Sequence, residues 1–252
     1  MSTSGPEPIP ASEALDALQR LPVAGLDEAL GDGGLLVIAP HPDDESLACG
    51  GLIAQACSEG RRVRVVVVSD GTGSHPRSRA FPRPRLRALR EAEARRALLA
   101  LGLAPRHVRF LRLPDRFVPH EGAAARAAVA AIVEAAREVE ALALFVSWRH
   151  DPHCDHQAAY KLARAAQRRL GARLFEYTVW GAALNAKAPV TSVSSGFRLY
   201  VGRERVRKRR AIAAHESQTT RLIADDPTGF RLTAADLARF AGPFEAFMAS
   251  GE

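Results

Sequence analysis

Short apolar runs alternate with longer helix-like segments along most of this 252-residue chain. Leu35–Ala39 (LLVIA) and Val63–Val68 (VRVVVV) are almost entirely apolar, which is typical of strands buried on both faces of a sheet. Each run is followed by a segment long enough for a helix. This alternation predicts βαβ units, and hence an α/β protein with a Rossmann-like, mostly parallel sheet and helices on both faces.

The same pattern places the individual elements. It predicts strands at 35–39, 63–68, 108–111, 141–146, 173–178 and 197–201. It predicts helices at 12–30, 46–58, 86–101, 123–139, 155–170 and 204–215. Residues 1–11 are rich in Pro, Ser and Gly, so we expect a disordered tail there. Residues 12–252 show no internal repeat and no domain boundary, which predicts a single domain.

Composition indicates the cellular compartment of the protein and the charge of its partners. Cys49, Cys57 and Cys154 match no disulfide framework and form no Cys-x-x-Cys pair, which favours a reducing compartment. The N-terminus resembles no signal peptide, and no stretch is long and apolar enough to span a bilayer. We therefore expect a cytoplasmic protein with no membrane partner. The formal net charge of +7 favours anionic partners or substrates.

A first polar cluster lies at residues 41–45 (HPDDE), directly after the first predicted strand. One imidazole and three carboxylates share five positions, and neighbouring carboxylates repel unless a positive charge is near. A divalent cation would relieve that repulsion. Acidic residues also favour a helix start through its free N–H groups and dipole, which suffices to explain Glu45 and Ser46. It does not explain a histidine and two aspartates together after an apolar strand.

A second polar cluster, at residues 153–156 (HCDH), follows the fourth predicted strand and opens a helix. His153 and His156 are three residues apart, so on a helical turn they share a face. Histidine is the commonest metal ligand, and Asp155 is near enough to orient one of the rings. We expect Cys154 to be a packing residue and the nearby His150 to be a surface or packing histidine.

The two clusters should meet, because sites in open α/β sheets form at the carboxyl ends of the strands. Three protein ligands of the His/Asp/His kind leave positions open on zinc, as in catalytic sites. A spare aspartate could take a proton from a water, and a spare histidine could stabilise negative charge on a carbonyl oxygen. The clusters therefore predict metal-assisted amide hydrolysis, with zinc or another divalent ion such as Fe²⁺.

The two motifs, A-x-H-P-D-D-E and H-x-D-H, resemble those of the PIG-L/LmbE-type zinc-dependent N-deacetylases. The resemblance runs from about Leu35 to His215. It implies a Rossmann-like hydrolase that removes an N-acetyl or other N-acyl group from a small polar substrate, of the N-acetylglucosaminyl type. Softer matches lie at Ser69-Asp70-Gly71, Arg90-x-x-Glu93, Leu101-Gly102 and His215-x-Ser217-Gln218.

Roles for individual residues follow from the resemblance, position by position. It implies three zinc ligands, namely His41, Asp44 and His156. It also implies that Asp43 is the general base. His153 would polarise the carbonyl and stabilise the oxyanion, and Asp155 would tune the charge of His153.

Other positions are left open by the resemblance or depart from it. Arg90 and Glu93 match a pair that lies near the site in the family, and the resemblance leaves their direct role open. Cys154 stands where proline is usual. Asp151 stands where some members carry a tyrosine that helps the transition state, so the substrate of this chain could differ from theirs.

Two basic segments admit two interpretations each. The loop at 71–85 either forms a substrate wall whose arginines hold an anionic group, or is a solvated flexible loop. The segment at 203–210 (RERVRKRR) lacks interleaved aromatic residues, so we expect a solvated helix face and no nucleic-acid partner. A homo-oligomer stays open.

Two other functions compete with deacetylation of a sugar-like substrate. The first is a metal hydrolase acting on a non-sugar N-acyl compound or a phosphoester. The second is a non-catalytic module that binds a metal or a nucleotide. Asp43 argues against the second, because metal binding alone does not need that residue. A nucleotide-binding Rossmann domain should also carry glycines after the first strand, where this chain has residues 41–44 (HPDD).

Overall fold

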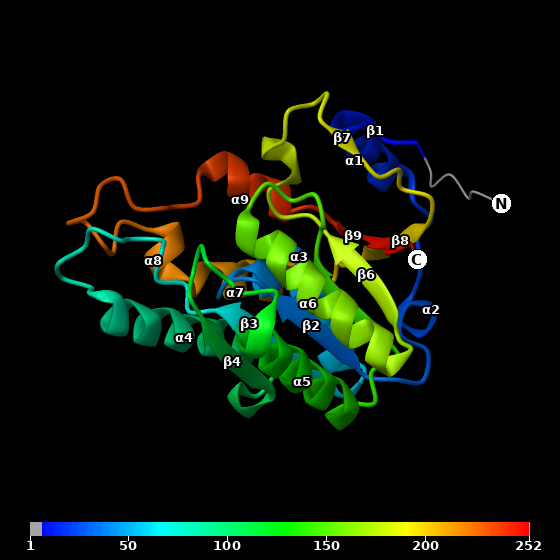
Figure 1. Cartoon of the computed structure of the whole chain (residues 1–252), viewed down its shortest axis with the longest axis horizontal. Coiled ribbons are helices and arrows are strands. Elements are labelled where there is room, and N and C mark those ends of the chain that lie inside the picture. Colours follow the sequence, from blue (N-terminus) through cyan, green and yellow to red (C-terminus); the bar gives the residue numbers. More distant parts are fainter. Residues whose placement is uncertain (1–6, 252) are drawn as a thin grey trace.

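A seven-stranded sheet forms the centre of the protein, which the computed structural model describes over residues 7–251 (Figure 1). The strands are β1 (Ile9–Pro10), β2 (Leu35–Ala39), β3 (Val63–Ser69), β4 (Val108–Leu113), β5 (Ala143–Ser147), β6 (Arg173–Tyr177), β7 (Pro189–Val190), β8 (Gly196–Tyr200) and β9 (Phe244–Ala249). The order in the sheet is β4-β3-β2-β5-β6-β9-β8, and β1 pairs with β7 in a separate ladder. The strands from β4 to β6 are parallel, whereas β9 runs antiparallel to both β6 and β8.

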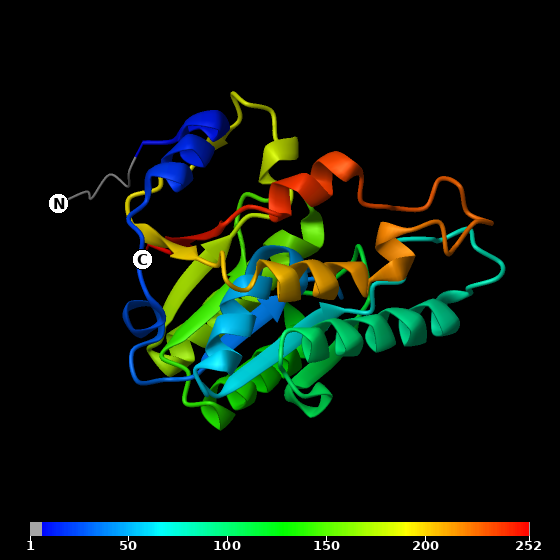
Figure 2. The ribbon, with the colours of Figure 1, turned by 180° about the vertical axis from the view of Figure 1, so that it is seen from behind.

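Helices cover both faces of this sheet. They are α1 (Ala11–Arg20), α2 (Leu26–Leu30), α3 (Asp44–Ser58), α4 (Arg83–Ala100), α5 (Gly122–Glu138), α6 (Cys154–Leu170), α7 (Arg205–Ala213), α8 (Glu216–Thr219) and α9 (Ala234–Phe240). Helices α5 and α6 lie on the face seen in Figure 1, and α3, α4 and α7 lie on the opposite face, seen in Figure 2. The predicted α/β class with helices on both faces is confirmed.

The apolar strands explain this layering. Successive side chains of a strand point to opposite faces, so a strand between two helical layers must be apolar throughout. In the fully buried β2, Leu36 and Ile38 pack with residues of α5 and α6. Leu35 and Val37 pack on the other face with residues of α3 and α4. The sheet therefore separates two hydrophobic cores, and one α/β domain results.

Parallel pairing brings the two polar clusters to one edge. Leu35 of β2 lies opposite Val63 of β3 on one side and Ala143 of β5 on the other. All three strands therefore end at the same edge of the sheet. The segments after β2 and β5 leave that edge side by side, which is where ligand sites form in such sheets.

The N-terminal region differs from its prediction. The helix expected at 12–30 is two helices, because Pro22 and Gly25 interrupt it and the backbone between them bonds to Arg198 of β8. The tail expected at 1–11 is wrong for its last residues, since Ile9 and Pro10 pair with β7 and Ala11 begins α1. Residues 1–6 lie outside the described residues.

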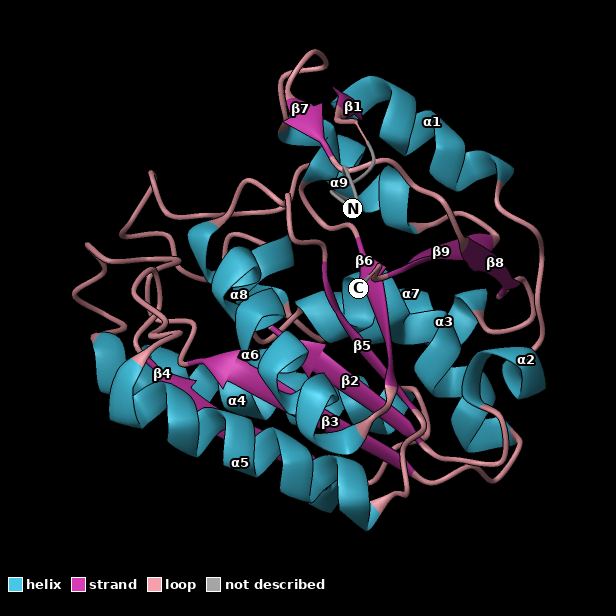
Figure 3. Ribbon diagram, turned by 45° about the vertical axis from the view of Figure 1, so that its right-hand side comes forward, coloured by secondary structure: helices cyan, strands magenta, loops and turns pink. Residues whose placement is uncertain are grey.

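The C-terminal strand β9 was not predicted. Its sequence, FEAFMA, inserts between β6 and β8 and joins the end of the chain to the sheet. Figure 3 shows α1 and the β1–β7 pair at the end of the molecule that lies beyond β8 and β9. Among the described helices, none combines the length and the apolar character needed to cross a membrane.

Candidate metal centre

The His41 cluster is built by the turn between β2 and α3. Helix α3 begins at Asp44, and the Asp44 carboxylate accepts a hydrogen bond from the backbone N–H of His41 at 2.9 Å. This bond folds the turn back on itself, as in a helix cap. His41, Asp43 and Asp44 are all buried there, so their polar atoms must find partners inside the protein.

Three of the predicted site residues converge on one point. His41 Nδ1, Asp44 Oδ2 and His156 Nε2 lie 3.2 Å from each other in all three pairs. Tetrahedral ligands at the usual zinc bond lengths lie about 3.3 Å apart, so the triangle has the size that a divalent ion requires. Two imidazole nitrogens and a carboxylate oxygen are also a donor set that suits zinc. These residues could hold a metal.

Carboxylates surround the far side of the His41 ring. Nε2 of His41 lies 3.2 Å from Asp155 Oδ2 and 3.4 Å from Asp115 Oδ1. Burial lowers the pKa of His41, but Asp115, Asp155 and Asp44 outweigh it and raise that pKa well above the ordinary value. The same field of negative charge would attract a cation to this point.

Asp155 has a different partner from the one predicted. Its carboxylate accepts hydrogen bonds from the backbone N–H groups of Arg116 and Val118, at 2.6 and 3.1 Å, and lies beside His41 Nε2. Toward His153 only its backbone N–H makes a hydrogen bond, donated to Nδ1 at 3.1 Å. The carboxylate of Asp155 therefore lies beside His41, while its negative charge still raises the pKa of His153 against the larger lowering effects of burial and of the two other rings.

His153 lies beside the triangle and is half-buried. It precedes α6 as the N-cap residue, and its ring lies 4.6 Å from that of His41 and 5.2 Å from that of His156. Burial, followed by the positive charge on those two rings, lowers the pKa of His153 to about 4. The expected positive charge on His153 is therefore not favoured. Because Nδ1 accepts a hydrogen bond, the neutral ring carries its proton on Nε2.

Asp43 is buried beside the triangle and pairs with an arginine. Arg90 Nη2 lies 3.1 Å from Asp43 Oδ2, and the same guanidinium donates to the carbonyl oxygens of Pro42 and Gly71. Burial raises the pKa of Asp43 to about 6, while Arg90 acts in the opposite direction. Arg90, whose role the sequence left open, thus contacts the predicted general base.

Glu45 and His215 form a buried pair behind Asp43. Glu45 accepts a hydrogen bond from the backbone N–H of Asp43 at 3.0 Å and lies 3.2 Å from His215 Nε2. The His215 ring also lies 3.3 Å from Ser46 Oγ. From the sequence, Glu45 was interpreted as an acidic residue that favours the start of a helix. In the fold its carboxylate also fixes the turn that carries Asp43.

Asp151 fixes His156 of the second motif, as Glu45 fixes the turn that carries Asp43 in the first. Asp151 Oδ1 lies 3.3 Å from His156 Nδ1, and Oδ2 accepts hydrogen bonds from the backbone N–H groups of Val179 and Trp180. A carboxylate on the far nitrogen fixes the orientation and tautomer of a metal-binding histidine. Asp151, which stands where some family members carry a tyrosine, is thus a partner of His156 in this chain.

A pocket of about 190 Å³ opens over two members of the triangle, His41 and Asp44. Residues from several loops line it together with the two motifs. Gly73 and Ser74 belong to the loop at 71–85, and the residues that the sequence did not single out are Asp115, Arg116, Trp180 and Phe230. Asp115 follows the end of β4 as His41 follows β2, and that position was the signal that could have identified it. Trp180 and Phe230 meet edge to face, with ring centroids 5.6 Å apart, so one wall is aromatic.

The loop at 71–85 borders this pocket through its first residues only. Asp225 accepts hydrogen bonds from the backbone N–H groups of Arg79 and Ala80, and Asp226 accepts one from Arg77. The side chains of Arg77, Arg79 and Arg83 are exposed and line no part of the pocket. The cations that line it are Arg90 and Arg116, so for these three arginines the structure favours the second interpretation of the loop, a solvated segment.

Comparisons with known proteins agree with this architecture. The N,N'-diacetylchitobiose deacetylase of Pyrococcus horikoshii is 18% identical, with 94% of this chain and 90% of that chain covered and a TM-score of 0.66. The deacetylase of the A40926 pseudoaglycone is 24% identical, with coverages of 88% and 100% and a TM-score of 0.60. A 4-carboxy-2-hydroxymuconate hydratase of Pseudomonas putida is 17% identical, with coverages of 87% and 97% and a TM-score of 0.63. These likenesses establish a shared fold.

Sequence comparison assigns the family. No curated protein matches the chain. The family model described as PIG-L, GlcNAc-PI de-N-acetylase, matches residues 36–167, which include both polar clusters. Since this match spans just over half of the chain, the protein belongs to the PIG-L family.

Proposed function

We propose that the protein is a zinc-dependent deacetylase that removes an N-acetyl group from a small polar substrate of the N-acetylglucosaminyl type. One observation carries the proposal: His41 and Asp44, which form a triangle with the fully buried His156, line the same pocket as the carboxylate of Asp43. The family description and two deacetylases of the same fold support it.

The triangle would be the metal site, with His41 Nδ1, Asp44 Oδ2 and His156 Nε2 as ligands. A divalent ion bound there would lower the pKa of a water molecule and polarise the amide carbonyl. A similar structure is described as the zinc-inhibited form of teicoplanin deacetylase, so the ion that supports activity needs its own measurement. Fe²⁺ would suit the same donors.

Asp43 would move the proton. A general base must be near the attacking water and must be ionised when the substrate binds. Asp43 lines the pocket, and Arg90 at 3.1 Å opposes the effect of burial on its pKa. In this role Asp43 takes a proton from the attacking water and then donates it to the nitrogen of the leaving amine.

His153 would stabilise the negative charge that develops on the amide oxygen. With Nδ1 occupied by the Asp155 amide, a neutral ring offers its Nε2–H as donor. A fixed donor aimed at a developing oxyanion lowers the barrier more than it strengthens substrate binding. The proposed role of His153 is therefore retained from the sequence, but with a neutral ring.

The pocket favours a compact, polar acyl acceptor. Its volume of about 190 Å³ is below the usual range for drug-sized ligands, which suits a single sugar ring at an open mouth. Asp115 and Arg116 could bind hydroxyl groups of such a ring, and Trp180 and Phe230 could pack against its apolar face. We propose a small N-acylated molecule as the partner and, from the three free cysteines, a cytoplasmic location.

Acetate release from a panel of N-acetylated compounds tests the activity. The panel includes N-acetylglucosamine derivatives, an N-acetylated amino acid and an unsaturated carboxylic acid, because a hydratase shares the fold. Protein reconstituted with Zn²⁺ or with Fe²⁺ should release acetate from the sugar derivatives. Asp43→Asn should keep the metal and lose about 10²–10⁴-fold in turnover, the usual effect of losing a general acid–base group. Hydration of the unsaturated acid without acetate release would refute the proposal.

A further inference from the structure

Gln218 of α8 lines the metal-site pocket, yet the proposed deacetylation assigns no task to it. Its side chain is fully buried, and its Oε1 atom has no hydrogen-bond partner among the described residues. Most buried polar side-chain atoms in folded proteins have a partner, so each exception needs a physical reason. Because Gln218 lines the pocket, a ligand bound there can supply the missing partner.

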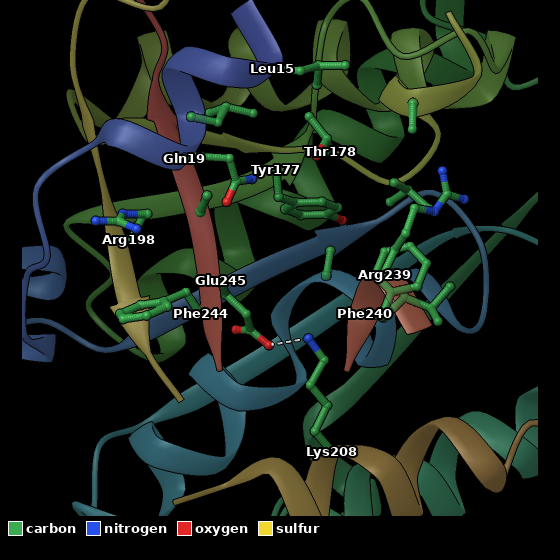
Figure 4. A pocket seen from close by; sticks show the side chains of 16 residues that line it. Leu15, Gln19, Tyr177, Thr178, Arg198, Lys208, Arg239, Phe240, Phe244 and Glu245 are labelled. Atoms are coloured by element: carbon green, nitrogen blue, oxygen red, sulfur yellow. Dashed lines mark hydrogen bonds and ion pairs between the residues drawn. The ribbon is translucent and has the colours of Figure 1, made fainter. Parts of the chain in front are cut away.

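A second cavity, of about 320 Å³, offers no such atom (Figure 4). Its Glu245 carboxylate accepts a hydrogen bond from Lys208 Nζ at 2.7 Å, and two more from the backbone N–H groups of Gly51 and Leu52. Within the part of the chain that the structure describes, no residue that lines this cavity has a buried polar side-chain atom without a partner. The metal-site pocket differs from it in this respect.

A chain of hydrogen bonds fixes the orientation of the Gln218 amide. Ser217 Oγ donates to Glu93 Oε2 at 2.6 Å, because a carboxylate only accepts. The hydroxyl proton of Ser217 is therefore used, and the hydroxyl oxygen accepts a hydrogen bond from Gln218 Nε2 at 2.8 Å. A flipped amide would set Oε1 against an oxygen that has no proton to donate. Nε2 thus faces Ser217, and Oε1 remains an acceptor.

The backbone of Gln218 is held as well. Its N–H donates to the carbonyl oxygen of His215 at 2.9 Å, and its carbonyl oxygen accepts a hydrogen bond from the N–H of Leu232 at 2.8 Å. These contacts hold the residue, and none of them uses Oε1. The acceptor is therefore fixed before a ligand binds, which limits the entropy that binding costs.

A hydroxyl group is the ligand group that this chemistry favours. Oε1 needs a partner that carries an O–H or N–H group. Arg90, which lines the same pocket, has the opposite need, because its buried Nε–H has no acceptor among the residues that the structure describes. A hydroxyl group both donates and accepts, and a sugar ring carries several of them.

We propose that Gln218 is a specificity-determining residue whose Oε1 accepts a hydrogen bond from a hydroxyl group of the acyl acceptor. This inference rests on the proposed function, which supplies the class of substrate. An acceptor without that hydroxyl group leaves Oε1 buried and unpartnered, and therefore binds more weakly. Gln218 would thereby select a sugar-like acceptor over an N-acylated amino acid that has no hydroxyl group.

Calorimetric titration with N-acetylglucosamine and with analogues that each lack one ring hydroxyl group tests the proposal. The titrations use metal-loaded Asp43→Asn, in which slow turnover preserves the ligand. One analogue should bind about 3–10-fold more weakly than N-acetylglucosamine, the effect of one lost hydrogen bond. Adding Gln218→Met, which keeps the length of the side chain but removes the acceptor, should weaken N-acetylglucosamine by the same factor and leave that analogue unchanged.

Gln55→Met is the matched control and should change no affinity, because Gln55 of α3 also has an unpartnered Oε1 but does not line the pocket. Metal content and the unfolding transition verify each variant, and Gln218→Asn, which shortens the side chain, replaces Gln218→Met if that variant does not fold. No binding of the sugar, equal binding of every analogue, or an equal loss for every ligand in Gln218→Met would overturn the proposal. The expected binding pattern without acetate release would refute the deacetylase and still support the role of Gln218.

Discussion

The His41 ring is held from both sides, and this arrangement explains several residues at once. Nδ1 faces Asp44 and His156, and Nε2 faces Asp155 and Asp115. Metal-binding histidines commonly donate the N–H of their other nitrogen to a carboxylate, which fixes the ring and strengthens the ligand. His156 has the same arrangement with Asp151 on its far nitrogen. Both proposed histidine ligands therefore carry their own carboxylate partner.

Removal of either histidine ligand should remove the metal. We expect His41→Ala and His156→Ala each to retain little bound ion, because two protein ligands bind a divalent cation far more weakly than three. Metal content per protein, measured by plasma mass spectrometry after dialysis, checks this. Asp43→Asn is the control and should keep its full metal content. Full occupancy in both histidine variants would contradict the ligand assignment.

His153→Ala should keep the metal and lose turnover by about 10²–10³-fold, the effect of removing one oxyanion donor. His153→Gln should recover part of the rate, because an amide can also donate. Burial lowers the pKa of His153 to about 4, so the ring is neutral above that pH. The rate should therefore show no loss between about pH 6 and 9 from deprotonation of His153. Loss of metal in His153→Ala would instead identify a ligand.

At the scale of elements, buried carboxylates join helices to the site. Glu93 of α4 accepts hydrogen bonds from the backbone N–H and the hydroxyl group of Ser217 in α8, at 2.8 and 2.6 Å. Gln218, the next residue, lines the metal-site pocket. The Arg90-x-x-Glu93 match thus has two functions: the arginine contacts Asp43, and the glutamate anchors the segment that carries Gln218.

Glu93→Ala should lower the free energy of unfolding by about 1–3 kcal/mol, because the N–H and O–H of Ser217 would lose their acceptor inside the protein. Urea unfolding followed by circular dichroism measures this change. Glu134→Ala provides the control: its ion pair with Arg109 is exposed and should contribute less than about 1 kcal/mol. Equal losses in the two variants would refute the anchoring role of Glu93.

At the scale of the whole molecule, β9 connects the end of the chain to the centre of the fold. Phe247 of β9 is fully buried, and its ring packs against Phe145 of β5 at 5.0 Å and Phe197 of β8 at 5.2 Å between centroids. Aromatic contacts of this kind stabilise beyond the area that they bury. The C-terminal strand is therefore part of the core that supports the metal site.

Phe247→Ala should cost about 3–5 kcal/mol of stability, through lost burial and the cavity that remains. Phe117→Ala is the matched control, since that ring is exposed and its loss should change stability by less than about 0.5 kcal/mol. Thermal unfolding of both variants provides the comparison. A melting temperature of Phe247→Ala equal to that of the unchanged protein would show that β9 contributes little.

The sequence alone determined the sheet and the place of the site. Runs such as LLVIA are apolar on both faces, and only a strand between two helical layers satisfies that pattern. Parallel strands then bring the segments at their carboxyl ends to one edge, so the clusters at 41–45 and 153–156 had to meet. Their local spacing indicated a cation because neighbouring carboxylates repel each other unless a positive charge is near.

Only the tertiary structure decided which carboxylate serves which histidine. Asp155 lies two residues from His153 in sequence, but its Oδ2 lies beside His41, and the backbone N–H groups of Arg116 and Val118 hold the carboxylate there. Asp115, Trp180 and Phe230 come from loops far apart along the chain, and no local pattern records their meeting. β9 escaped prediction for the same reason: its place between β6 and β8 depends on pairing with strands distant in sequence, which periodicity cannot express.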